Sequence, residues 1–196
     1  MPRTATVERS TKETNVAVSV NLDGRGEHRL ATGVGFFDHM LSHLAVHGLL
    51  DLHVQATGDL EVDAHHVVED VGIALGQALC QAAGDKAGMV RYGAGMCPMD
   101  EALVVVALDF GGRAHLEYAV EPPAERTGQF DTVLAREFLA ALAANAGLAL
   151  HLRQESGLNS HHILESAFKS LGRALDQATA LDPRRATPPS TKGMLV

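Results

Sequence analysis

The sequence predicts an α+β protein of two duplicated units, each ordered strand, strand, helix, strand, helix (ββαβα), with two sheets sandwiching a helical layer. The first observation is a repeat: HHVVEDVGIALGQAL begins at His65, and HHILESAFKSLGRAL begins 96 residues later, at His161. The second is that LDLHVQATGD, ending at Asp59, recurs as LALHLRQESG, ending at Gly157. The third is that strand and helix periodicities follow one another in the same order in both halves.

The first predicted unit has two strands, a helix, a third strand and a second helix. Residues 14–24 and 27–34 alternate apolar and polar side chains around a turn at Asp23-Gly24, which indicates two strands. Residues 36–48 have helical spacing. Residues 50–59 then alternate as a strand, and residues 65–83 continue as a helix.

The second predicted unit follows the same order. It has strands over residues 101–112 and 115–122, a helix over 131–147, a strand over 148–157 and a helix over 160–179. We assign residues 1–90 to the first unit and 91–196 to the second, with Arg91–Gly95 as the joint. Each half is too short to bury its helices well by itself, so we expect one integrated globular unit.

The composition favours a protein that acts on small molecules. A formal net charge of −8 argues against nucleic acid as the main partner, because nucleic-acid binders usually carry a basic patch. No apolar run approaches the roughly 20 residues of a membrane-spanning helix, and the first residues lack the apolar stretch of a signal peptide. The two cysteines make no disulfide framework. We therefore expect a cytoplasmic protein with no membrane or nucleic-acid partner.

The histidines are the anomaly, since the chain has 11 and most of them are clustered. On a helix, residues four apart share a face and neighbours diverge by about 100°, so His65 and Glu69 can share one ion while His66 points elsewhere. The second copy of the motif has the same pattern, with His161, His162 and Glu165. A single copy would usually be a solvated pair, but two copies in register favour a metal site. A set of His and carboxylate donors without cysteine suits manganese, iron or zinc, and the carboxylates favour the harder ions.

A histidine stripe also follows the first predicted helix, at His39, His43 and His47. For His43 and His47 a structural role and a ligand role stay equally open. The repeated LDLH and LALH strands are offset by 98 residues, and this offset pairs His39 with Glu137, which can also bind a borderline or hard cation. His39 is therefore the strongest ligand candidate of the stripe.

Five segments, FFDHMLSHLAVHG, HHVVED, SHHILE, MDEAL and PPSTKG, together resemble the imidazoleglycerol-phosphate dehydratase family, from about Thr11 to Lys192. The resemblance implies the ribosomal protein S5 domain 2-like fold. It also implies a hydro-lyase of histidine biosynthesis that converts imidazole glycerol phosphate to imidazole acetol phosphate and water. Two manganese ions per active site and a large homo-oligomer of trimers, a 24-mer with sites at subunit contacts, are further implications.

The resemblance also assigns roles to individual residues. One ion would be held by His39, His66, His161 and Glu165, and the other by His65, Glu69 and His162. The family usually has one more histidine ligand where this chain has Glu137, so either this carboxylate or a water would complete the second ion. Substrate contacts would come from Glu13, His39, His47, His65, Glu69, Arg91, Arg113, His161, Lys169, Ser190, Thr191 and Lys192. Of these, Arg91, Arg113, Lys169, Ser190 and Lys192 match the phosphate-binding pattern, and their donors suit a dianion.

The catalytic candidates are Glu13, Asp100 and Glu165. The proton to be removed lies next to no carbonyl, so two ions bound to the substrate's imidazole would have to acidify its N–H and give a metal-bound imidazolate that expels the neighbouring hydroxyl. An acid must protonate that hydroxyl and a base must take the proton of the next carbon, with Glu13 as the first candidate.

Two other interpretations stay open from the residues alone. A dinuclear metal hydrolase could use the same ligands and phosphate contacts, and would release inorganic phosphate. A metal-storage or metal-stabilised oligomer could place the histidine clusters at subunit contacts without any turnover.

Overall fold

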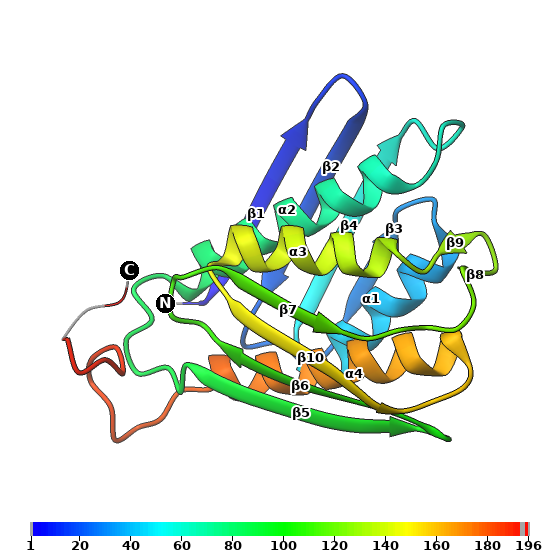
Figure 1. Cartoon of the computed structure of the whole chain (residues 1–196). Helices are drawn as coiled ribbons and strands as arrows, with labels where there is room; N and C mark the ends of the chain where they lie inside the picture. Colours follow the sequence, from blue (N-terminus) through cyan, green and yellow to red (C-terminus); the bar gives the residue numbers. More distant parts are fainter. Residues whose placement is uncertain (1, 193–194, 196) are drawn as a thin grey trace.

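Two four-stranded sheets lie on the outside of the molecule, and four helices lie between them (Figure 1). The structure is a computed structural model that describes residues 2–192 and 195, and these elements and one short hairpin are its regular structure. The predicted α+β class, with two sheets around a helical layer, is confirmed. No helix within the described part of the chain is long and apolar enough to cross a membrane.

The first unit contributes one sheet and two helices. Its strands are β1 (Thr4–Ser10), β2 (Thr14–Asn21), β3 (His28–Ala31) and β4 (Asp51–Gly58), in the spatial order β1-β2-β4-β3. Its helices are α1 (Gly35–Gly48) and α2 (His65–Ala83). Alternate residues of β2 and β4 are buried, so each strand turns one face toward the helices.

The second unit repeats this arrangement. Its strands are β5 (Tyr92–Met99), β6 (Ala102–Asp109), β7 (His115–Ala119) and β10 (Ala149–Ser156), in the spatial order β5-β6-β10-β7. Its helices are α3 (Leu134–Ala146) and α4 (Ser160–Thr179). The short hairpin of β8 (Arg126–Thr127) and β9 (Phe130–Asp131) precedes α3.

Each unit also has an additional strand in front of the predicted order. Most of the segment predicted as the joint, Arg91–Gly95, is instead the first half of β5, and its glycines lie directly against α4. A Cβ atom on Gly93 would be 1.8 Å from Ala174 O, and one on Gly95 would be 1.9 Å from Ser170 O. The glycines therefore permit close packing of a strand on a helix, which strand periodicity alone does not reveal. The division at residue 90 stays a prediction, and residues 193, 194 and 196 of the second unit lie outside the described residues.

The first two predicted strands of each unit do not pair with each other. In the first sheet β4 lies between them, antiparallel to β2 and parallel to β3. In the second sheet β10 lies between β6 and β7 in the same way. The predicted turn at Asp23-Gly24 is instead the start of a crossover that passes over β4, and a Cβ atom on Gly24 would lie 2.3 Å from Asp51 N.

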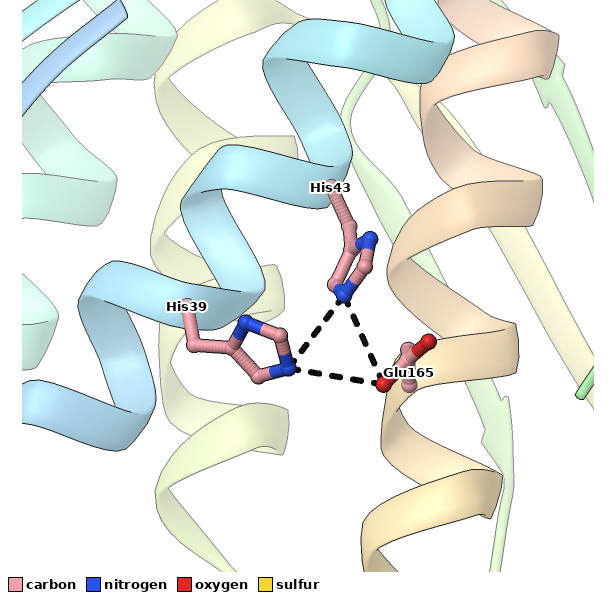
Figure 2. Close-up of side chains that lie close together, drawn as sticks. All are labelled: His39, His43 and Glu165. Carbon is pink, nitrogen blue, oxygen red and sulfur yellow. Dashed lines mark hydrogen bonds and ion pairs between the residues drawn. The ribbon is translucent and has the colours of Figure 1, made fainter.

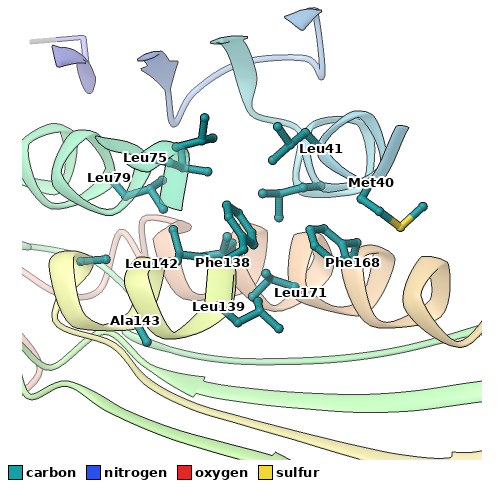
Figure 3. Close-up of a cluster of buried hydrophobic side chains, with 14 of the residues drawn as sticks. Met40, Leu41, Leu75, Leu79, Phe138, Leu139, Leu142, Ala143, Phe168 and Leu171 are labelled. Carbon is teal, nitrogen blue, oxygen red and sulfur yellow. The ribbon is translucent and has the colours of Figure 1, made fainter. Parts of the chain in front are cut away.

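The two units are interlocked through their helices. α2 packs against α3 of the other unit, and α4 packs against α1, around a core that includes Phe138, Phe168 and Leu75 (Figure 3). Equivalent glycines allow both contacts: a Cβ atom on Gly76 would lie 2.8 Å from Leu142 O, and one on Gly172 would lie 2.9 Å from Leu44 O. Neither unit can bury its helices without the other.

The helix ends define two sides of the molecule. The N-terminal ends of all four helices point to one side, and the C-terminal tail lies at the opposite side (Figure 1). Both copies of the His-His-x-x-Glu motif lie at the first of these sides, because His65 opens α2 and His161 is the second residue of α4.

Candidate active site

Side chains of α1 and α4 converge on the carboxylate of Glu165, and Figure 2 shows this residue with His39 and His43. Glu165 Oε2 lies 3.4 Å from His39 Nε2 and 3.4 Å from His43 Nε2. The same oxygen lies 3.2 Å from His161 Nε2, and Glu165 Oε1 lies 2.5 Å from Lys169 Nζ. We call these five residues the α1–α4 cluster.

Helical spacing explains why these side chains meet. His39 and His43 are one turn apart on α1, and His161, Glu165 and Lys169 are successive turns of one face of α4. The side chain of Asn159 accepts a hydrogen bond of 2.9 Å from His161 N and so fixes the start of α4.

The electrostatics of the α1–α4 cluster suit a cation. Burial by itself would raise the pKa of Glu165, but the Lys169 ammonium and the imidazoles of His43 and His39 lower this pKa to about 2. Burial lowers the pKa of His43 to about 4, which outweighs the opposite influence of Glu165. At neutral pH the cluster thus offers an ionised carboxylate and a neutral His43, which are the forms that bind metals.

A second group of candidates lies at the start of α2, at the tip of the first sheet. His66 Nδ1 lies 3.0 Å from Asp59 Oδ2, and His66 Nε2 lies 3.9 Å from Glu13 Oε2. The hydrogen bond to Asp59 raises the pKa of His66. His65 Nε2 and Glu69 Oε2, one turn apart on a half-exposed face, are separated by 4.0 Å. We call His65, His66, Glu69, Glu13 and Asp59 the α2 cluster.

His162 has a comparable environment at the tip of the second sheet. Its Nδ1 lies 2.8 Å from Glu101 Oε2, and its Nε2 lies 4.0 Å from Asp100 Oδ2. The hydrogen bond to Glu101 raises the pKa of His162 and, with backbone donors from Asn159 and Leu158, lowers the pKa of Glu101 to about 2. Both second histidines of the repeated motif therefore have a carboxylate on Nδ1.

Two further candidate residues, Glu137 and His47, lie outside the clusters described above. Glu137, in the first turn of α3, pairs with its neighbour Arg136 at 3.2 Å and has no ion pair or hydrogen bond with a histidine in the described part of the chain. His47 stacks on His43, with ring centroids 5.8 Å apart, and burial lowers its pKa. The structure thus extends the histidine stripe of α1 beyond the α1–α4 cluster.

A pocket of about 280 Å³ lies at the opposite side of the molecule, beside the C-terminal tail. It is lined by Arg91, Tyr92, Gly111, Arg113, Pro189, Ser190, Thr191, Lys192 and Leu195. Arg91 is held by two hydrogen bonds to Asp109, of 2.6 and 2.8 Å, and it donates a third, of 2.8 Å, to Pro189 O. Five predicted substrate-binding residues therefore share this tail pocket, whereas Lys169 lies in the α1–α4 cluster.

The tail pocket and the α1–α4 cluster lie at opposite ends of α4. Arg91 N donates to Ala178 O in the last turn of α4, whereas Glu165 lies near its start. At about 1.5 Å per residue, the intervening helix spans roughly 20 Å. Within the described residues, no ion pair or hydrogen bond joins His66 to the α1–α4 cluster, or His162 to His65 or Glu69. The predicted ligand sets are thus only partly assembled in one chain.

The structure shows contacts of three residues that the sequence could not supply. The four-residue spacing of the histidines on α1 indicated His43, but only the approach of α4 places its Nε2 at Glu165. Asp59 lies beside His66 Nδ1 from the turn just before α2, and Glu101 lies beside His162 Nδ1 from a hairpin far away in the sequence. No sequence periodicity relates a turn carboxylate to a histidine on another element.

Comparison with known proteins identifies close relatives. Residues 32–175 match a family model described as imidazoleglycerol-phosphate dehydratase. A protein of that name from Desulforamulus reducens is 58% identical over 193 residues, which cover 98% of this chain and 98% of that protein. Another from Nostoc sp. is 57% identical over 196 residues, which cover 100% of this chain and 94% of that protein.

Solved structures of the same family are also similar to this chain. A crystal structure of imidazoleglycerol-phosphate dehydratase from Staphylococcus aureus has a TM-score of 0.83 and 37% identity, and covers 91% of this chain and 99% of that one. A crystal structure described as IGPD from Pyrococcus furiosus, in complex with (S)-C348, has a TM-score of 0.81 and 36% identity, and covers 96% of this chain and 100% of that one.

Proposed function

The chain belongs to the imidazoleglycerol-phosphate dehydratase family, and we propose that it removes water from imidazoleglycerol phosphate, a step of histidine biosynthesis, at a centre that holds two manganese ions. The activity is that of a hydro-lyase, and its product would be imidazole acetol phosphate. The observation that carries the metal part of the proposal is the convergence of three imidazoles on Glu165 Oε2.

The donors of the α1–α4 cluster fit a divalent ion. Imidazole and carboxylate donors bind such ions at about 2.1 Å, so two donors of one ion lie about 3.0 Å apart at right angles and about 3.4 Å apart at the tetrahedral angle. The observed separations of 3.2 and 3.4 Å from Glu165 Oε2 lie in this range. The mixed set without cysteine suits manganese, which would act as a Lewis acid and make the N–H of the substrate's imidazole more acidic.

The remaining donors come from His65, His66, Glu69 and His162. A carboxylate on Nδ1 leaves Nε2 of His66 and His162 as the coordinating atom, an arrangement common among metal-bound histidines. Glu137 would supply the last donor of the second ion, or a water would take its place. His39, His161 and Glu165 belong to one predicted ligand set and already lie together, whereas His66 has to reach them from elsewhere.

One chain keeps these parts too far apart for one substrate. A three-carbon chain with an imidazole at one end and a phosphate at the other cannot span the roughly 20 Å between the tail pocket and the α1–α4 cluster. We infer that neighbouring copies complete each site, within a large homo-oligomer of trimers that contains 24 chains. Lys169 could then meet the phosphate held in another copy's tail pocket.

The acid and base roles favour Glu13 over Glu165. Both oxygens of Glu165 are occupied, one by Lys169 and the other by the imidazoles, so this residue is better suited to hold a metal. Glu13 is more than half exposed and lies beside His66 Nε2. In the reaction, a protonated carboxyl would donate its proton to the leaving hydroxyl, which departs as water. A carboxylate would take the proton of the next carbon, and the resulting enol becomes the ketone.

The direct test is incubation of manganese-loaded protein with imidazoleglycerol phosphate, following the enolisable product. Release of inorganic phosphate without this product would favour the hydrolase, and metal-dependent assembly without turnover would favour a storage role.

Glu13→Gln should lower kcat by at least about a hundredfold, and Lys12→Gln, in the same turn, should not. Light scattering with and without manganese measures the assembly, and a monomer that turns over at full rate would contradict the shared site.

A further inference from the structure

The two hairpins that carry Glu13 and Glu101 are copies of each other. β1 pairs with β2 from Thr4↔Asn21 onward, and β5 pairs with β6 from Tyr92↔Asp109 onward, so an offset of 88 residues relates both strands at once. Glu13 immediately precedes β2 and Glu101 immediately precedes β6. The two glutamates therefore occupy the same place in the two units.

The equivalent glutamates contact different sides of equivalent histidines. Glu101 Oε2 lies 2.8 Å from His162 Nδ1, and Glu101 Oε1 accepts hydrogen bonds of 3.1 and 2.9 Å from Leu158 N and Asn159 N. Both oxygens of Glu101 are thus occupied. Glu13 lies on the other side of His66, 3.9 Å from Nε2, and its carboxylate makes no hydrogen bond within the described residues.

Asp59 accounts for this difference. It follows β4 directly, and its Oδ2 lies 3.0 Å from His66 Nδ1, the position that Glu101 holds at His162. The repeat places Gly157 at the corresponding point of the second unit, where there is no side chain to reach the ring. The turn glutamate fills this role in the second unit because the strand end cannot.

We propose that Asp59 is a positioning residue: it holds His66 with Nε2 toward the metal and keeps Glu13 out of the Nδ1 contact, so that Glu13 can act in the reaction. This inference rests on the proposed roles of His66 as ligand and Glu13 as acid or base. The two copies of the turn glutamate thus have different functions. Glu101 orients His162, whereas Asp59 orients His66 and leaves Glu13 available for proton transfer.

Two details of the first hairpin support this division. Thr11 Oγ1 accepts hydrogen bonds from Glu13 N and Thr14 N, of 3.1 and 2.9 Å, which holds the turn closed, whereas the second turn follows Met99 and has no such acceptor. Asp59 Oδ1 is buried and has no hydrogen-bond partner within the described residues. A buried carboxylate oxygen without a partner is costly, and a functional constraint on the other oxygen explains why it is retained.

The test compares Asp59→Ala with Glu61→Ala, which removes the same charge from an exposed position of the same loop. Manganese affinity is measured on the whole assembled protein by competition with a chelator. Asp59→Ala should weaken this affinity about 10- to 100-fold, as loss of a carboxylate behind a metal-binding histidine does. Glu61→Ala should match the wild type. Asp59→Asn keeps the shape of the side chain and should weaken the affinity less.

A double-mutant cycle tests the role of Glu13. At saturating manganese, Asp59→Ala should still lower kcat by about tenfold, because Glu13 turns toward Nδ1, and this loss should vanish in the Glu13→Gln background. Unchanged manganese affinity in both Asp59 variants would overturn the positioning role, and additive losses of kcat would overturn the part that concerns Glu13. Wild-type protein that binds manganese but forms no product would contradict the proposed function, while the chelator competition would still decide on Asp59.

Discussion

The α1–α4 cluster has a counterpart between α2 and α3, because the two units are copies. The offsets of the repeat pair His39, His43, His161, Glu165 and Lys169 with Glu137, Ala141, His65, Glu69 and Ile73. In the α1–α4 cluster, imidazoles and an ammonium surround a buried carboxylate. Between α2 and α3, an alanine and an isoleucine replace two of the polar groups, and Glu69 is half-exposed, 4.0 Å from His65.

The difference shows that duplication preserved the packing of the helices and changed their charges. Gly76 and Gly172 make the same close approach to the partner helix, at Leu142 O and Leu44 O. Packing tolerates little change because a Cβ atom at either glycine would overlap the neighbouring backbone. The side chains at the helix ends have no such constraint. The α1–α4 cluster could therefore gather several donors around one carboxylate within a chain, whereas His65 and Glu69 are 4.0 Å apart.

Equivalent substitutions of the two motif glutamates should separate the clusters most clearly. Glu165→Gln and Glu69→Gln should each lower kcat/KM by at least about a hundredfold, because each would remove a proposed metal ligand. Only Glu165→Gln should also destabilise the metal-free protein, by about 2 kcal/mol, since Lys169 loses its charged partner. Glu69 is half-exposed, so its replacement should change the free energy of unfolding by less than about 0.5 kcal/mol. Equal losses in the free energy of unfolding for the two variants, measured in urea, would contradict this difference between the clusters.

The shared packing should respond equally in both units. Gly76→Ala and Gly172→Ala should each lower the free energy of unfolding by about 1–3 kcal/mol, because the added methyl group would lie less than 3 Å from the facing backbone. Gly35→Ala is the matched control, since a Cβ atom there meets nothing within 4 Å. Thermal unfolding at a fixed protein and manganese concentration measures the effect. A large loss in only one unit would show that the helix contacts have diverged.

The smallest expected effect concerns the pH dependence of metal binding, which should differ between His43 of the α1–α4 cluster and the two sheet-tip histidines, His66 and His162. The hydrogen bonds that Asp59 and Glu101 accept raise the pKa of His66 and His162 above the usual 6.5. Protons would therefore begin to compete with metal for these histidines above that pH, by about tenfold per pH unit for each proton. His43, with its pKa lowered to about 4 by burial, adds no competition there.

The raised histidine pKa also predicts how the free energy of unfolding of the metal-free protein depends on pH. A raised histidine pKa stabilises the fold below pH 6.5, and this contribution is lost as the pH rises through the raised pKa. Glu101→Gln should remove the contribution of His162: it should weaken manganese binding near neutral pH, as loss of Asp59 does, and move the loss of metal by protonation to lower pH. Manganese affinity measured from pH 5 to 8 would refute the assignment if the variant and the wild type lost metal at the same pH.

Several features could be predicted from the sequence because they depend on local spacing. The repeated motif placed His65 and Glu69 on one helix face, and the stripe placed His39 and His43 on another. The strands with alternating burial were predicted for the same reason. β1 and β5 were missed, and in β5 the glycines that permit contact with α4 resemble a loop.

The sequence by itself determined the duplicated α+β architecture and the histidine and glutamate pairs of each motif, because both follow from periodicities of two and 3.6 residues along one chain. Only the tertiary structure decided which pairs meet: α4 brings Glu165 to His43, a strand end brings Asp59 to His66, and the length of α4 separates the tail pocket from the metal donors. His43 and Glu165 belong to helices far apart in the sequence, whereas Asp59 and His66 are close in sequence but meet across the turn between β4 and α2. Both contacts depend on how helices and sheets pack rather than on periodicity along one element.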